Sequence, residues 1–242
     1  MEASKVILVV GAGDATGGAI ARRFARAGYV ACVTRRHADK LRDLVAAIEA
    51  EGGRARAFGS DARKEEAVTE LVAQIEGEVG PIEVAVFNIG ANVRFPVTET
   101  TARVYFKVWE MACFAGFLMG REVAKVMLPR GRGTILFTGA TASVRGGNGY
   151  CAFAGAKAGL RALAQSMARE FSPKGIHVAH VVIDGAIDTE FIRVNFPERA
   201  ALKDQDGILN PEAIAEVYWT LSQQTRSAWT HEMDLRPWIE AW

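Results

Sequence analysis

Cysteine is scarce in this sequence, which has three, Cys32, Cys113 and Cys151, and no C-x-x-C pair. All three fall in segments that we expect to be strand or helix. A disulfide framework and a zinc site built on paired cysteines are therefore both disfavoured. We expect free, buried thiols and no bound metal.

An excess of one charge and a long apolar run are also missing. The 29 basic and 28 acidic side chains are interspersed, so the chain offers no extended basic face to nucleic acid. The first apolar run, residues 6–10, leads directly into a glycine loop, and it is far shorter than the roughly 20 residues of a membrane span. We expect a cytoplasmic protein with neither nucleic acid nor a membrane as partner.

The composition, half apolar over 242 residues, suits one domain with a sizeable core. Apolar runs typical of buried strands cover residues 6–10, 30–34, 55–59, 84–88, 134–138 and 177–183. Amphipathic stretches between them predict helices at about residues 16–28, 38–51, 63–78, 100–128, 152–171 and 211–223. This alternation predicts an α/β fold, a single domain over 1–242 with a doubly wound parallel sheet in three layers. Residues 188–211, irregular and charged after residue 195, are expected to form a substrate loop or lid.

A glycine loop follows the first predicted strand and opens the first predicted helix. It contains Gly11, Gly13 and Gly17, whose missing side chains allow a backbone to approach a pyrophosphate. The helix that begins there supplies unpaired N–H groups. This context favours dinucleotide binding. The alternative is a glycine turn that serves only tight strand-helix packing.

The end of the second predicted strand carries basic rather than acidic residues. An Asp or Glu there would bond the adenosine ribose hydroxyls, but the sequence has Arg35 and Arg36. Guanidinium groups match a 2′-phosphate, so NADP(H) is favoured over NAD(H) as cofactor. The alternative for this arginine pair is a solvated helix entrance.

Over essentially its whole length the chain resembles the short-chain dehydrogenase/reductase superfamily. Its loop is similar to the family's T-G-x-x-x-G-x-G, with Val10 and Ala15 in place of the Thr and the middle Gly. The resemblance implies a Rossmann-type fold, a nicotinamide cofactor and a small-molecule substrate. It also implies a homodimer or homotetramer, joined through the helices at 100–128 and 152–171. The cofactor-binding residues that we expect are Gly11, Gly13, Asp14, Thr16, Gly17, Arg35, Arg36, Asp61, Ala62, Asn88, Gly90, Lys157, Gly185, Ile187 and Thr189.

Individual roles also come from the resemblance. It implies that Asp61 meets the adenine and that Asn88 to Gly90 lie beneath the adenosine ribose. Ile187 and Thr189 correspond to the segment that holds the nicotinamide carboxamide. Asp184 stands where that segment usually has a Pro. An acidic group there is either functional or a turn or helix-capping residue.

The family's catalytic set is Asn, Ser, Tyr and Lys, and only Lys157 survives in this sequence. Cys113 stands at the Asn position, Ala140 at the Ser position and Phe153 at the Tyr position. A phenyl ring has no O–H and cannot protonate a substrate oxygen. Cys113 cannot replace an Asn that anchors a water chain to the Lys. The sequence therefore predicts an atypical active site.

Substitutes for the missing donors lie nearby. Tyr150 precedes Lys157 by seven residues, about two helical turns, which resembles the Tyr-x6-Lys arrangement of enoyl-carrier-protein reductases. The alternative for Tyr150 is pocket wall or interface surface. Thr141 and Ser143 flank Ala140 and offer hydroxyls, or satisfy backbone groups in the turn. We expect Lys157, Tyr150, Thr141 and Ser143 to be the catalytic candidates.

Two histidines and the C-terminal segment complete the observations. His177 and His180 lie three apart on a strand, hence on opposite faces, and are expected to be structural. The aromatic segment 229–242 suggests a subunit contact or a lid.

The favoured function is an NADP(H)-dependent oxidoreductase with a non-standard site that reduces an activated C=C, C=N or C=O bond. Aromatic residues near the expected site suggest an apolar substrate. The first alternative is a catalytically silent NADP(H)-binding protein, a sensor or assembly subunit. The second is lyase or isomerase chemistry on the same fold.

Overall fold

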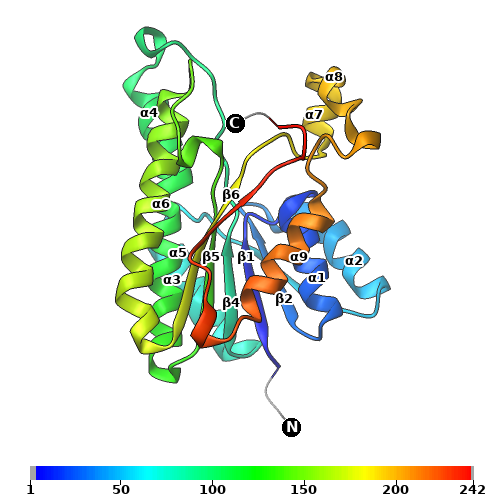
Figure 1. Ribbon diagram of the computed structural model, residues 1–242. Coiled ribbons are helices and arrows are strands. Elements are labelled where there is room, and N and C mark those ends of the chain that lie inside the picture. The colour runs from blue at the N-terminus through cyan, green and yellow to red at the C-terminus, as the bar shows by residue number, and fades with distance from the viewer. Residues whose placement is uncertain (1–3, 241–242) are drawn as a thin grey trace.

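A computed structural model describes residues 4–240 of the chain. Its centre is a parallel sheet in the order β3-β2-β1-β4-β5-β6-β7, and the strand order reverses between β1 and β4 (Figure 1). The fold is the predicted single-domain, Rossmann-type α/β arrangement. The strands are β1 (Val6–Val10), β2 (Val30–Arg35), β3 (Arg54–Gly59), β4 (Ile82–Phe87), β5 (Gly133–Thr138), β6 (Ile176–Ile183) and β7 (Glu232–Leu235).

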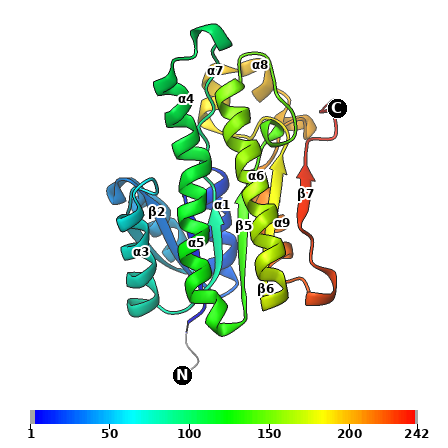
Figure 2. The same ribbon diagram turned by 90° about the vertical axis from the view of Figure 1, so that its left-hand side faces the viewer.

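Helices cover both faces of the sheet and give the three layers predicted (Figures 1 and 2). The helices α1, α2 and α9 pack on one face, and α3, α5 and α6 pack on the other. The bounds are α1 (Thr16–Arg26), α2 (Arg42–Ala50), α3 (Glu65–Glu78), α4 (Ala102–Trp109), α5 (Ala115–Met127), α6 (Cys151–Phe171), α7 (Glu190–Asn195), α8 (Pro197–Ala200) and α9 (Pro211–Ser222).

Burial explains why the central strands read as continuous apolar runs. Every residue of β1 and β6 is buried, because helices cover both faces of these strands. The edge strand β3 is different: of its residues, Phe58 alone is buried. Its apolar pattern is accordingly the weakest among the six predicted strands.

The structure differs from the sequence-based expectation in three segments. The helix expected over 100–128 is interrupted by a π-helical turn, Glu110–Phe114, between α4 and α5. The segment 188–211 contains α7 and α8, and α8 lies in the part after residue 195 that was expected to be irregular. Strand β7 was not predicted at all. It lies within the aromatic segment 229–242, whose last two residues lie outside the described range.

Part of that C-terminal segment packs onto its own chain. Trp229 stacks on His177 with the ring centroids 4.9 Å apart, and β7 pairs with β6. Trp238 is 77 % exposed, yet its indole N–H donates to the Gln205 carbonyl at 2.9 Å, just beyond α8. This segment therefore joins the sheet edge to the loop that carries α7 and α8.

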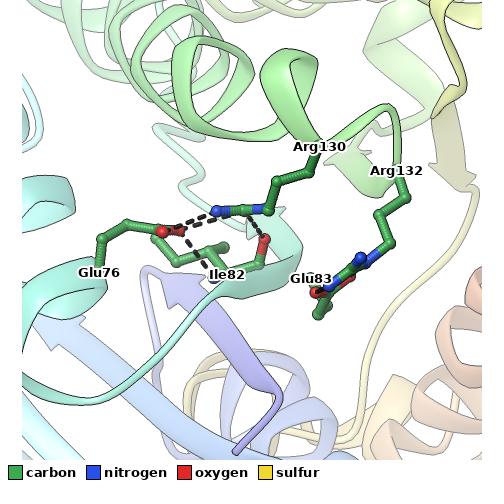
Figure 3. A network of polar contacts seen from close by, with 5 residues as sticks. All are labelled: Glu76, Ile82, Glu83, Arg130 and Arg132. Carbon is green, nitrogen blue, oxygen red and sulfur yellow. Dashed lines mark hydrogen bonds and ion pairs between the residues drawn. The ribbon is translucent and has the colours of Figure 1, made fainter. Parts of the chain in front are cut away.

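An ion-pair network joins α3 and the segment after α5 to the start of β4 (Figure 3). Arg130, after α5, binds both carboxylate oxygens of Glu76 on α3 at 2.7 and 3.2 Å and donates to the Ile82 carbonyl at 2.8 Å. Glu76 in turn accepts the Ile82 N–H at 2.8 Å. Within residues 4–240 no helix is long and apolar enough to cross a membrane.

Candidate active site

Most of the predicted site residues lie together at the carboxyl ends of the central strands. The glycine loop follows β1, Arg35 ends β2 and Asn88 follows β4. The turn with Ala140 to Ser143 follows β5, and Asp184 follows β6. In a doubly wound sheet, ligands bind in the crevice at this edge, where the strand order reverses.

Two of the three loop glycines are tightly packed, and the third has free space beside it. Gly11 has φ +88°, and a Cβ there would lie 2.8 Å from the Asn88 carbonyl oxygen. A Cβ on Gly17 would lie 2.5 Å from the Gly11 oxygen, which also accepts from the Asn88 side-chain amide at 3.1 Å. A Cβ on Gly13 would approach only Arg35, at 3.5 Å. Packing therefore explains Gly11 and Gly17, whereas Gly13 leaves space for a ligand.

The start of α1 suits an anion. Thr16 is the first helical residue, and Ala15 before it provides no side-chain cap. The first turn has no acidic side chain, so its N–H groups and helix dipole favour a negatively charged ligand. Asp14 lies close by, but its side chain is 90 % exposed and sits 3.7 Å from Arg35.

A cavity of about 170 Å³ lies beside this loop, at the ends of β1, β2 and β3. Its lining includes Gly11, Arg35, Arg36, Asp61, Ala62 and Arg63. Arg35, Arg36, Asp61 and Ala62, all predicted cofactor residues, thus lie around one cavity, together with Arg63. The guanidinium groups of Arg35 and Arg36 would suit a phosphate on a ribose.

Arg63 is a lining residue that sequence reasoning missed. Its guanidinium binds both oxygens of Asp61 at 2.8 and 2.7 Å, and this pairing lowers the pKa of Asp61 to about 2. The Asp61 carboxylate is therefore held by Arg63. The only sequence signal was position, two residues after the predicted Asp61.

Lys157 is buried on α6 and joins the ends of two strands. Its Nζ donates to the Thr138 carbonyl at 2.7 Å and to the Ile89 carbonyl at 3.1 Å. Burial lowers the pKa of Lys157 to about 8. The ammonium group thus lies between the end of β5 and the residue that follows Asn88.

The three residues that we expected at the family's Asn, Ser and Tyr positions meet in one apolar cluster. Cys113 and Phe153 are buried in it, and Ala140 packs against it. Burial raises the pKa of the Cys113 thiol. Tyr150, the predicted substitute donor, also packs against this cluster.

Tyr150 is the residue immediately before α6, so its backbone lies at the start of that helix. The guanidinium of Arg94, from the loop after β4, lies 5.8 Å from the centre of the Tyr150 ring. Gly149 has φ +83°, and a Cβ there would lie 2.9 Å from the Arg94 side chain. This loop and the start of α6 therefore pack together.

The hydroxyls beside Ala140 have different partners. Thr141 donates to the buried carboxylate of Asp184, which lies 3.7 Å from both Arg145 and Arg236. Ser143 is buried, and its Oγ accepts the Ala140 N–H at 3.1 Å. Thr141 thus joins β5 to β6 through Asp184, while Ser143 bonds the turn backbone, one of the two roles foreseen for it.

The remaining cofactor candidates lie after β6 and β4. Gly185 has φ +149° and packs against Pro237, and Ile187 forms a bridge with Leu209. The Thr189 Oγ1 accepts the Ile192 N–H at 3.2 Å and caps α7. A Cβ on Gly90 would meet nothing within 4 Å.

A Rossmann-type sheet with a glycine loop at its switch point defines a nucleotide-binding class of fold. Residues 5–200 match the profile of the short chain dehydrogenase family. The chain belongs to the short chain dehydrogenase family.

Relatives of several activities support this assignment. The chain is 32 % identical to 2-dehydro-3-deoxy-D-gluconate 5-dehydrogenase of Formosa agariphila over 175 residues, 72 % of this chain and 66 % of that protein. It is 30 % identical to gluconate 5-dehydrogenase of Gluconobacter oxydans, over 71 % of this chain and 67 % of that protein. The matched segment thus spans about two thirds of these relatives' length.

Solved structures cover almost the whole chain. A short-chain dehydrogenase from Rhodopseudomonas palustris is 50 % identical, with a TM-score of 0.83, over 97 % of this chain and 99 % of that one. A metagenomic short-chain oxidoreductase in complex with NADP has a TM-score of 0.82 over 98 % of each chain. At 24 % identity, the second likeness shows the fold.

Proposed function

We propose that this protein is an NADP(H)-dependent oxidoreductase acting on a small-molecule substrate. The observation that carries the proposal is the cavity beside the glycine loop, where Arg35, Arg36 and Arg63 gather next to an uncapped helix start. Gly13 and the first turn of α1 would hold the pyrophosphate, and the arginines would hold a 2′-phosphate. NADPH would supply the hydride. The dehydrogenase names of the relatives support this class of reaction.

The active site of this enzyme is atypical in our proposal. Lys157 would bind the nicotinamide ribose, but Cys113, Ala140 and Phe153 would form an apolar cluster where the family has Asn, Ser and Tyr. Tyr150 and Thr141 are then the candidates that would orient a substrate. Because strong general-acid help is missing, we expect an activated C=C, C=N or C=O bond in an apolar substrate.

A screen of NADPH oxidation over enones, imines and ketones tests this proposal. We expect turnover of one class, at least about tenfold slower in Tyr150→Phe and lost in Lys157→Ala. Cofactor fluorescence must show that NADPH still binds to both variants. Turnover of ketones alone, unchanged in Tyr150→Phe, would contradict the role of Tyr150.

A catalytically silent NADP(H)-binding protein is the second candidate, and the apolar cluster at the three substituted positions favours it. Tight NADPH binding without turnover of any substrate class would support this candidate. Sustained turnover by the pure protein would exclude it.

We further propose a homodimer or homotetramer that acts in the cytoplasm. Tyr105, Phe106 and Trp109 of α4 are exposed, and a surface hollow of about 480 Å³ lies between them and Gly155 of α6. Exposed aromatic faces of this kind mark protein contacts, and here a second copy presents the same helices. The free cysteines suit a reducing compartment.

A further inference from the structure

Asp184 carries a buried carboxylate directly after β6, and its side chain is only 4 % exposed. Its backbone N–H donates to the Leu235 carbonyl of β7 at 2.8 Å, so pairing with β7 fixes the position of its backbone. A helix-capping role was one expectation for this residue, but α7 takes its cap from the Thr189 side chain. The Asp184 carboxylate instead accepts a hydrogen bond from the turn after β5.

Two guanidinium groups balance the charge of this carboxylate. A nitrogen of Arg145 lies 3.7 Å from one carboxylate oxygen, and a nitrogen of Arg236 lies 3.7 Å from the other. A buried charge needs such opposite charges to offset the cost of leaving water. An ionised carboxylate carries no proton, so it only accepts hydrogen bonds. Asp184 is therefore an acceptor in each of its side-chain contacts.

The hydroxyl of Thr141 is the donor to this carboxylate. A hydroxyl group has one proton and two lone pairs. Because the proton of Thr141 is directed at Asp184, only the lone pairs of the hydroxyl remain for a substrate. Asp184 thus fixes Thr141 as an acceptor of hydrogen bonds.

Thr141 also occupies a suitable place in the candidate active site. It follows Ala140, which packs against the apolar cluster of the site. Three residues before Thr141, the Thr138 carbonyl accepts from Lys157 at 2.7 Å. The other hydroxyl of the turn, that of Ser143, is buried and accepts the Ala140 N–H. Thr141 is half-buried, so it is the hydroxyl of this turn that a substrate can reach.

We propose that Thr141, held by Asp184, selects a substrate that carries a neutral hydroxyl or N–H group beside the bond that is reduced. That group donates to the Thr141 oxygen, and Asp184 is the positioning residue. A neutral donor is favoured over a cation because Arg145 and Arg236 already balance the carboxylate. This inference rests on the proposed oxidoreductase function and narrows its apolar substrate to one with a hydrogen-bond donor.

Neutron diffraction from crystals of the deuterated full chain tests the hydrogen bond without any substrate. We expect a deuteron on the Thr141 oxygen, directed at Asp184, and none on the carboxylate. A deuteron on Asp184, or a Thr141 deuteron directed away from the carboxylate, would overturn the inference.

Matched substrate pairs in the NADPH-oxidation screen test the selectivity. Hydroxyacetophenone and its methyl ether form a ketone pair, and hydroxymethyl cyclohexenone and its methyl ether form an enone pair. We expect kcat/KM to be about tenfold higher for the hydroxyl member of the pair that is turned over, since the ether has no proton for Thr141. Equal values, or a preference for the ether, would overturn the inference.

Two variants separate hydrogen bonding from the size of the added methyl group. Thr141→Val keeps the volume but removes the lone pairs, so the ratio of the two kcat/KM values should fall to about one. Asp184→Asn supplies an amide that can donate to Thr141 and frees the hydroxyl proton for an ether oxygen, so the ratio should fall here too. Fluorescence titration checks that both variants still bind NADPH.

Thr134→Val is the matched control, because Thr134 is a buried threonine near the opposite end of β5. We expect it to keep the ratio of the unaltered protein. A ratio that persists in Thr141→Val, or that is lost equally in Thr134→Val, would overturn the inference. If the unaltered protein turns over no substrate of the screen, the proposed function fails, while the neutron result still decides whether Thr141 is held as an acceptor.

Discussion

At the residue scale, Gly13 and Gly17 of the same loop have opposite surroundings. A Cβ on Gly17 would lie 2.5 Å from the Gly11 oxygen, whereas a Cβ on Gly13 would meet only Arg35, at 3.5 Å. We predict that Gly13→Ala leaves the denaturation midpoint unchanged but weakens NADPH binding at least about tenfold, since its Cβ occupies the pyrophosphate space. Gly77→Ala on α3, where a Cβ would also meet nothing within 4 Å, is the control for fluorescence titration. Unchanged NADPH affinity in Gly13→Ala would contradict the binding mode.

Lys157 predicts a pH dependence of stability. Its pKa is about 8 in the folded chain and 10.5 in the unfolded one, so the unfolded chain binds more protons between these values. Stability from this group therefore rises with pH, by about 2 kcal/mol between about pH 8 and pH 10. Urea unfolding at both pH values should show this gain relative to Lys157→Met. The same slope in the two proteins would contradict a buried, destabilised ammonium.

Only some residues of the candidate site could be placed from the sequence. The glycine loop, Arg35 and Asp61 could be placed because each stands at a strand end. Arg63 could not, because its hold on Asp61 depends on the direction of a side chain. The partners of Thr141 and Ser143 were equally out of reach, since they depend on how a short turn meets β6.

At the element scale, the ion pairs in Figure 3 differ in how many elements they join. Arg130 binds Glu76 and the β4 backbone, and both side chains are 21 % exposed. Arg132, 59 % exposed, forms an ion pair with the Glu83 side chain. We predict that Arg130→Gln lowers the unfolding free energy by about 2 kcal/mol, and that Arg132→Gln lowers it by less than about 1 kcal/mol. Equal losses in urea unfolding would contradict this ranking.

Five strands were predictable as buried runs of apolar residues and β3 from a weaker pattern, whereas β7 was not predicted. Its sequence, Glu232 to Leu235, alternates charged and apolar residues over four positions and is only partly buried. Pairing with β6, rather than its own pattern, makes it a strand. The π-helical turn at Glu110–Phe114 was not predicted either. One wide turn hardly changes the apolar periodicity of a helix, so the sequence pattern does not reveal it.

At the scale of the whole molecule, the exposed aromatic side chains of α4 predict self-association. Phe106→Asp puts a charge into that face, and we expect it to shift a dimer or tetramer to monomer in light scattering after size exclusion. Phe191→Asp on α7 is the control, because Phe191 is 62 % exposed but lies outside the α4 face. A monomeric unaltered protein, or dissociation by both variants, would count against this interface.

The measurement that tests the account most directly is fluorescence titration of NADPH and NADH against the pure protein and its Arg35→Gln, Arg36→Gln double variant. The account predicts tighter binding of NADPH than of NADH. In the double variant, NADPH affinity should fall about 100-fold and NADH affinity by less than about threefold, as expected for loss of two charge-assisted contacts to a 2′-phosphate. Preferential NADH binding, or equal losses for both nucleotides, would contradict the assignment of the cavity beside the glycine loop.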